Sequence, residues 1–207
     1  MNYNELKEKA HSNAVKHGFW ENRLSNEHCL MLVITEVGEL VEADRKGITA
    51  RKLKFEKALS YGSYLSTLAI YGYDTKEKAE QYMLYDDWKR QKFNHDCFRE
   101  NIKESFDDEF AHVAIRLLDL AGALGVDFDK MKPCRYYRAY NKFSFTENAF
   151  GLVKGLSRDV ISIEKRIQFG LVYVTNWAHS LGVDLAWYIE QKMMYNESRP
   201  PLHGKKY

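Results

Sequence analysis

Apolar residues recur along most of the chain at intervals of three and four positions, not at every second position. This spacing is typical of amphipathic α-helices, and proline, which interrupts helices, occurs only 3 times. The pattern predicts helices over residues 3–17, 26–46 and about 102–124, with further helices in the second half of the chain. We therefore expect an all-α fold in which the helices form one bundle.

The helix predicted over residues 26–46 has clear signals at both ends. Ser25 or Asn26 is a suitable N-cap, and Gly47 is a suitable stop after the basic residues Arg45 and Lys46. The following stretch, residues 48–100, is richer in charge and tyrosine, and it predicts two or three shorter helices around a Tyr-Gly-Tyr-Asp turn. We interpret this stretch as an insertion between two longer helices.

A repeated motif suggests that the second half of the chain copies the first. Leu-Gly-Val-Asp at 124–127 recurs 57 residues later at 181–184, and each copy is predicted to lead through a short helix to an aromatic–Asn ending, at Asn141 and Asn196. Two stacked helical units would bury faces that one unit leaves exposed. The alternative is chance similarity between helical segments. The expected organisation is one domain, 1–207, with a first unit, 1–142, that contains the insertion 48–100, and a degenerate second unit, 143–207.

Two of the predicted helices carry charged residues inside apolar surfaces. Glu36 and Glu39 lie three residues apart in a segment that is otherwise almost entirely apolar. One face of the third helix carries Glu109, His112, Arg116 and Asp119. A carboxylate in a dry core is costly unless it is paired or binds a metal. Two such helices facing each other could pool their carboxylates around Mg²⁺ or Mn²⁺, cations that bind phosphate chains.

A purely structural network is the alternative explanation of the same polar face. In that network Arg116 pairs with Asp119 or Glu39, and no metal enters. At the offset of 57 residues the second unit has no acid in the corresponding positions, which are Arg166, Phe169, Tyr173 and Asn176. If the repeat is real, only the first unit keeps the polar site.

Composition and charge narrow the possible partners. The net charge of +2 provides no large positive field, so we expect no nucleic-acid partner. No apolar run approaches the length of a membrane span, so we expect no membrane partner. The 3 cysteines lack the spacing of a disulfide or zinc framework, which is typical of a reducing compartment, and we expect a cytoplasmic protein.

Three segments together resemble the MazG-like all-α nucleoside triphosphate pyrophosphohydrolases, the superfamily that includes dCTP pyrophosphatases and dimeric dUTPases. They begin at Thr35, Glu109 and Lys192. The corresponding family pattern is a Glu-x-x-Glu helix, then a Glu-x-x-Asp helix, then a late Lys-Met-x-x-Asn segment. The resemblance covers residues 3–47, 101–128 and 184–207. It implies a Mg²⁺-dependent enzyme, with Mn²⁺ as an alternative, that hydrolyses a nucleoside or deoxynucleoside triphosphate to the monophosphate and pyrophosphate.

The resemblance also implies roles for individual residues. Glu36, Glu39 and Glu109 would be catalytic metal ligands, one of them also orienting or deprotonating the attacking water. Lys192 and Asn196 match the family's phosphate- and sugar-contacting residues. The remaining predicted substrate contacts are Tyr195, Arg116 and Trp20, the last of which could stack on a nucleobase.

One position departs from the family pattern. His112 stands where the second motif has Asp, and an imidazole is a poor Mg²⁺ ligand but binds Mn²⁺, Co²⁺ or Ni²⁺. The change therefore either alters the metal preference or weakens the site, and Asp108, one helical turn earlier, could substitute. If the site is weakened, the chain is a catalytically inactive nucleotide sensor or a partner-binding helical protein. The resemblance also implies assembly, because MazG-like proteins generally form dimers or tetramers of helical units. An internal repeat could instead make each chain its own pseudo-dimer, so a homodimer and a monomer are both open.

Overall fold

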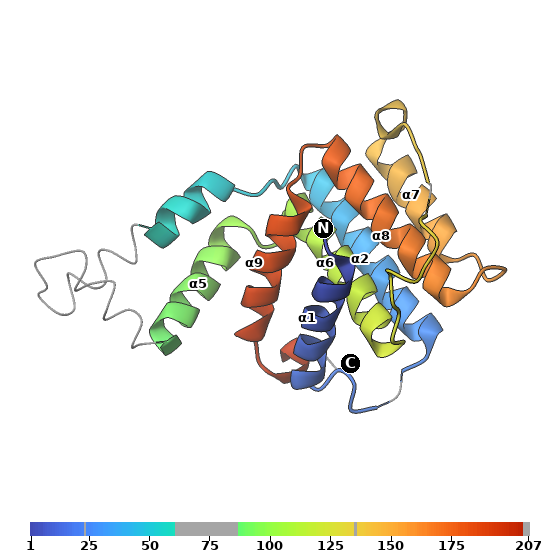
Figure 1. Cartoon of the computed structure of the whole chain (residues 1–207). Helices are drawn as coiled ribbons and strands as arrows, with labels where there is room; N and C mark the ends of the chain where they lie inside the picture. Colours follow the sequence, from blue (N-terminus) through green and yellow to red (C-terminus); the bar gives the residue numbers. More distant parts are fainter. Residues whose placement is uncertain (23, 61–86, 135, 205–207) are drawn as a thin grey trace, which may run out of the picture. The chain divides into compact units, whose positions relative to one another are not determined.

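The computed structural model describes residues 1–22, 24–60, 87–134 and 136–204 (Figure 1). Helices are the only regular secondary structure in these residues, which confirms the predicted all-α class. In the same residues no helix is both long enough and apolar enough to cross a membrane. The labelled α-helices are α1 (Tyr3–Lys16), α2 (Asn26–Lys46), α5 (Asp87–Asn101), α6 (Phe106–Ala123), α7 (Phe145–Leu156), α8 (Ile163–Ser180) and α9 (Leu185–Glu197), with short 3₁₀ helices η1 (Tyr140–Lys142) and η2 (Pro201–Gly204). Residues 52–60 are also helical.

The chain divides into two compact units. The first combines Met1–Thr49 with Glu104–Tyr207, and the second is Ala50–Lys103. The second unit corresponds closely to the insertion predicted over 48–100, and in it residues 52–60 and α5 are helical. The expected Tyr-Gly-Tyr-Asp turn lies outside the described residues. The predicted organisation as one domain of two related units stays a prediction.

Helix α2 begins and ends where the sequence predicts. The Ser25 hydroxyl oxygen accepts a hydrogen bond from the backbone N–H of His28 at 3.1 Å. At the other end Gly47 adopts a left-handed conformation with φ of 66°. This conformation strains residues that carry a Cβ atom, so Gly47 ends the helix at little cost.

The variant Gly47→Ala is expected to lower the free energy of unfolding by about 1 to 2 kcal/mol. An added Cβ at Gly47 would meet no atom within 4 Å, so the whole cost comes from the positive φ. Gly38→Ala is the matched control because its Cβ also meets no atom within 4 Å and its backbone is helical. That variant should stabilise the protein by about 0.5 to 1 kcal/mol. Urea unfolding measures both changes, and equal effects of the two variants would contradict this account.

Helix α6 is the central helix of the first unit, where it packs against α1, α2, α8 and α9. Its apolar residues Val113, Leu117 and Leu118 are fully buried. The centre of the Phe110 ring lies 4.9 Å from the centre of the Trp177 ring on α8. Because every residue of the helix except Ala123 is buried or half-buried, its polar face also lies largely inside the protein. The acids predicted on this face must therefore be compensated by neighbouring groups.

Two predicted helical stretches differ in the structure. Helix α6 begins at Phe106 and not at residue 102, because Glu104 has a positive φ of 66° and the Ser105 hydroxyl caps the helix through the N–H of Asp108. The short helix expected between Asp127 and Asn141 is wrong, since this stretch has no α-helix in its described residues. Pro133 lies within it and disfavours helical backbone in the residue before it.

Helices α6 and α8 have features that bear on the predicted repeat. Each has 18 residues, and both ends of α8 lie 57 positions after those of α6. Each is followed by a glycine with positive φ, Gly125 at 63° and Gly182 at 76°. The likeness ends there, because only the second copy continues into a helix, α9. The repeat itself stays a prediction.

Candidate metal centre

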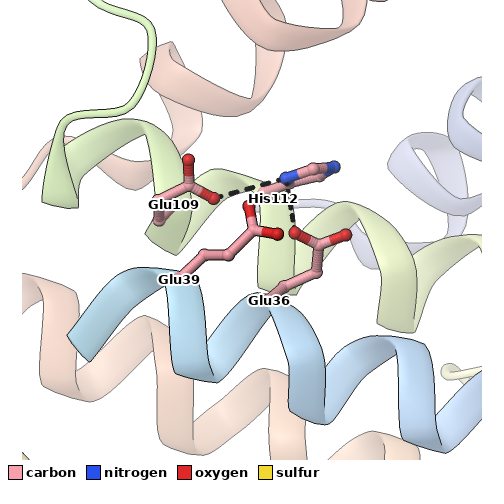
Figure 2. A group of neighbouring side chains, drawn as sticks. All are labelled: Glu36, Glu39, Glu109 and His112. Carbon is pink, nitrogen blue, oxygen red and sulfur yellow. Dashed lines mark hydrogen bonds and ion pairs between the residues drawn. The ribbon is translucent and has the colours of Figure 1, made fainter. Parts of the chain in front are cut away.

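Helices α2 and α6 bring the four predicted metal ligands together. Each of Glu36, Glu39, Glu109 and His112 offers one ligand atom, and these atoms all lie within 4.8 Å of one another (Figure 2). In Figure 2 the three carboxylates and one imidazole nitrogen converge between the two helices. We call these four residues the Glu3His cluster. Their arrangement could hold a metal ion, as the sequence predicted.

The spacing inside the Glu3His cluster suits a divalent cation. The His112 Nδ1 atom lies 2.8 Å from Glu36 Oε2 and 3.3 Å from Glu109 Oε2. Ligands about 2.1 Å from an octahedral ion are about 3.0 Å apart when adjacent and about 4.2 Å apart when opposite. The observed separations are close to these values. The residues therefore fit a divalent cation after small side-chain movements.

The cluster is buried at one end and open at the other. Glu36 is 2% exposed and Glu109 is 4% exposed, whereas Glu39 is exposed to solvent. Burial of Glu36 follows from the helix period, because it shares a face of α2 with the buried residues Val33 and Leu40. A molecule that reaches the cluster from solvent would therefore meet Glu39 first.

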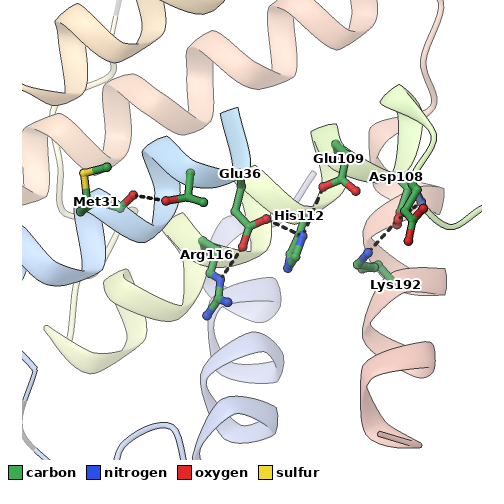
Figure 3. A network of polar contacts seen from close by, with 9 residues as sticks. Met31, Glu36, Asp108, Glu109, His112, Arg116 and Lys192 are labelled. Carbon is green, nitrogen blue, oxygen red and sulfur yellow. Dashed lines mark hydrogen bonds and ion pairs between the residues drawn. The ribbon is translucent and has the colours of Figure 1, made fainter. Parts of the chain in front are cut away.

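Arg116 is bound to a member of the cluster. Its Nε donates a hydrogen bond to Glu36 Oε1 at 3.2 Å, so the predicted pairing with Asp119 or Glu39 is replaced by one with Glu36 (Figure 3). The guanidinium carbon also lies 5.5 Å from the centre of the Phe19 ring. Arg116 thus fixes the orientation of the Glu36 carboxylate and offsets part of its charge.

Asp119 has different partners, which link α6 to the N-terminal helix. Its Oδ1 accepts a hydrogen bond from Trp20 Nε1 at 2.8 Å and lies 2.8 Å from His11 Nδ1. The Trp20 and His11 rings meet edge to face with centres 5.3 Å apart. The Trp20 indole predicted to stack on a nucleobase is therefore held in place by Asp119. No spacing along the sequence indicates this arrangement, because its partners are about one hundred positions apart in the chain.

Lys192 forms a buried ion pair beside the cluster. Its Nζ donates a hydrogen bond to Asp108 Oδ2 at 2.7 Å; Asp108 is 0% exposed and Lys192 is 3% exposed. The backbone N–H of Glu104 donates to the same carboxylate oxygen at 3.1 Å. Asp108, considered above as a substitute metal ligand, is instead paired with Lys192 and is not one of the four clustered residues (Figure 3).

The environment of this pair keeps Lys192 charged. Burial lowers the pKa of Lys192, but Asp108, Glu109 and Glu36 outweigh that effect, so its pKa lies above the ordinary value. Burial raises the pKa of Asp108, and the Lys192 ammonium opposes this shift. Lys192 therefore brings a fixed positive charge close to the acidic cluster.

Tyr195 and Asn196, the other residues predicted on α9, are also buried. Lys192 Nζ lies 5.9 Å from the centre of the Tyr195 ring, and the guanidinium carbon of Arg199 lies 5.7 Å from it. Asn196 lines a cavity of about 30 Å³ together with His112 and Arg116.

A larger cavity lies next to Trp20. It has a volume of about 650 Å³, and its lining includes His11, Trp20 and the first residues of α2. Cavities of this size are typical of small-molecule sites. Trp20 also lines a smaller cavity that Arg116 borders, so it stands between the larger cavity and the residues next to the cluster.

Comparison with known proteins gives the chain no family. No protein-family model, no curated protein and no solved structure matches it. Its function must therefore be argued from the motifs and from the geometry of the site.

Proposed function

We propose that the chain is a divalent-metal-dependent nucleotide pyrophosphohydrolase, which cleaves a nucleoside or deoxynucleoside triphosphate to the monophosphate and pyrophosphate. The observation that carries this proposal is the convergence of Glu36, Glu39, Glu109 and His112 within 4.8 Å of one another. The resemblance of the same segments to MazG-like enzymes supports it. When bound, a divalent cation supplies charge neutralisation at phosphate oxygens and activates water for attack.

The residues around the cation divide into those that hold it and those that position its ligands. Glu36 and Glu109 are buried and have fixed partners, which suits permanent ligands. Arg116 orients Glu36 through the bond from its Nε. Glu39 is exposed to solvent, so its carboxylate is the one most accessible to an attacking water and to its proton.

The surroundings of the cluster suit an anionic, nucleotide-like molecule. The charge of Lys192 offsets that of the nearby carboxylates, which lowers the repulsion that a phosphate chain would otherwise meet. Trp20 lines the cavity of about 650 Å³ and is kept in place by Asp119. We assign the phosphates to the Glu39 side of the cluster and the nucleobase to the Trp20 side.

The direct test is pyrophosphate release from each common NTP and dNTP in the presence of Mg²⁺ or Mn²⁺. We expect release with at least one nucleotide and none after metal removal by a chelator. The isosteric variant Glu109→Gln should lower kcat/KM by about 100-fold or more, because a catalytic metal contributes several kcal/mol. Glu190→Gln is the control: Glu190 is exposed, lies on α9 and is not part of the cluster, and its loss should leave activity unchanged.

Two results, one from this assay and one from calorimetry, would overturn the enzymatic proposal. No release with any nucleotide or metal, when a known pyrophosphohydrolase is active under the same conditions, contradicts it outright. Calorimetric binding of a non-hydrolysable nucleotide without turnover would favour the alternative, a nucleotide sensor. The predicted homodimer is a separate expectation, which light scattering of the purified chain measures.

A further inference from the structure

His112 is the member of the cluster whose chemistry differs from that of the others. Mg²⁺ takes oxygen ligands almost exclusively, whereas imidazole nitrogen is a common ligand of the first-row transition metals. The imidazole is not at the margin of the site: its Nδ1 lies within 3.3 Å of oxygens from both Glu36 and Glu109. A cation held by these two carboxylates would therefore have a nitrogen in its coordination sphere.

The second nitrogen of the same ring faces a different environment. Figure 2 shows it on the side of the imidazole turned away from the three carboxylates. His112 also lines the cavity of about 30 Å³, together with Asn13 and Asn196. A cavity of this size has room for a water molecule, which needs roughly 10 to 15 Å³.

The two asparagines of this cavity have acceptor atoms that need a donor. The Oδ1 atoms of Asn13 and Asn196 are buried and have no hydrogen-bond partner among the described residues. Asn196 is only 5% exposed, so bulk water does not satisfy it. Two groups that line the same cavity can supply a donor: the outer N–H of His112, directly or through one water molecule, and the guanidinium of Arg116, whose Nε already donates to Glu36.

This arrangement is the usual support of a metal-binding histidine. Such a histidine binds the ion through one ring nitrogen and donates the other N–H to a carbonyl, a carboxylate or a water. The outer bond selects the tautomer in which the inner nitrogen has a free lone pair. Here the acceptors of the cavity would hold the proton on Nε2, which leaves Nδ1 free to bind a cation between Glu36 and Glu109.

We propose that His112 binds the cation through Nδ1, that Asn196 positions its ring through Nε2–H, and that the centre consequently takes Mn²⁺ in preference to Mg²⁺. This inference rests on the metal-dependent function proposed above, and it identifies the metal that the function uses. Asn196, to which the family resemblance gives a substrate contact, becomes a positioning residue for a metal ligand.

The test measures metal binding and needs no substrate. Electron spin echo spectroscopy of the chain loaded with Mn²⁺ should show a directly coordinated nitrogen, and this coupling should disappear in His112→Asp. Competition between Mn²⁺ and Mg²⁺, followed by the Mn²⁺ resonance, should give a Mn²⁺ preference that falls by about tenfold in His112→Asp, since an all-oxygen set suits Mg²⁺.

Variants at Asn196 test its positioning role separately. Asn196→Ala should weaken Mn²⁺ binding by about 10-fold to 100-fold, as the loss of an outer-shell partner does. Asn196→Asp keeps an acceptor for Nε2–H and should retain the affinity. Circular dichroism verifies folding, and if Asn196→Ala does not fold, the comparison of Asn196→Asp with the wild type still decides whether an acceptor suffices.

Results that contradict this inference differ from results that contradict the enzymatic proposal. Mn²⁺ binding without nitrogen coupling, or a metal preference unchanged in His112→Asp, would overturn the role of His112 even if nucleotides are hydrolysed. Loss of affinity in Asn196→Asp as severe as in Asn196→Ala would overturn the positioning role. Conversely, nitrogen coupling in a chain that hydrolyses no nucleotide would support this inference and contradict only the proposed function.

Discussion

Lys192→Met is expected to destabilise the protein by about 3 to 5 kcal/mol, the typical cost of breaking a buried ion pair from one side. Asp108 is 0% exposed and its ionic partner is Lys192, at 2.7 Å, so the variant leaves a carboxylate buried without a counter-charge. Urea unfolding at neutral pH measures the loss. Lys165→Met is the control, because Lys165 is exposed on α8, and it should change stability by less than about 0.5 kcal/mol.

The pH dependence of the variant follows from the pKa shifts of the pair. Burial raises the pKa of Asp108, and the Lys192 ammonium is the strongest influence that opposes this shift. In the variant, therefore, the Asp108 carboxylate takes up a proton more readily in the folded protein than in the unfolded chain. Its stability deficit should therefore shrink as the pH falls and the carboxyl becomes neutral. In the wild type the pKa of Lys192 is raised, so the stabilising charge persists through neutral pH and is lost only in strongly alkaline solution.

A double variant separates the cost of an unpaired charge from the value of the pair. Asp108→Leu combined with Lys192→Met removes both charges and should recover most of the lost stability, because apolar replacement of a buried pair is often neutral. Lys192→Met as stable as the wild type at neutral pH would contradict the account of this pair.

Glu36→Gln is expected to abolish the stabilisation of the fold by divalent cations. A ligand that binds only the folded state adds about 2.7 kcal/mol at a concentration 100 times its Kd. Glu36 touches both His112 and Arg116, so its neutralisation removes one ligand and disturbs the orientation of another. Thermal unfolding with and without Mn²⁺ should show a rise in Tm for the wild type and none for Glu36→Gln.

The control for this experiment is Glu190→Gln, which changes the net charge equally at an exposed position outside the cluster. It should keep the full Mn²⁺-dependent rise in Tm. If Glu36→Gln retains the rise as well, the cation that stabilises the protein binds somewhere other than the Glu3His cluster.

The sequence predicted those features that depend on neighbouring residues. Both ends of α2 follow from the residues next to them, the Ser25 hydroxyl at the start and the left-handed backbone of Gly47 at the end. Glu109 and His112 share a helix face because they are three positions apart. That this face lies against Glu36 and Glu39 of α2 was inferred from the apolar surfaces of the two helices, which indicated that they pack together.

Features that depend on residues far apart in the sequence were not predictable. The Lys192 ammonium and the Asp108 carboxylate are 84 positions apart, so nothing local shows that they pair. The same holds for Arg116 with Glu36, 80 positions apart, where the sequence offered Asp119 or Glu39 equally well. The start of α6 was missed for a local reason, because a positive φ at Glu104 is unusual for a residue with a Cβ atom.

The central claim, that Glu36, Glu39, Glu109 and His112 hold one divalent cation, is tested most directly by anomalous X-ray diffraction from crystals of the chain grown with Mn²⁺. The account predicts one strong anomalous peak, with oxygens of the three carboxylates and Nδ1 of His112 as its protein neighbours. Crystals with bound Mn²⁺ elsewhere and no peak between α2 and α6, or with no bound Mn²⁺ at a saturating concentration, would contradict it.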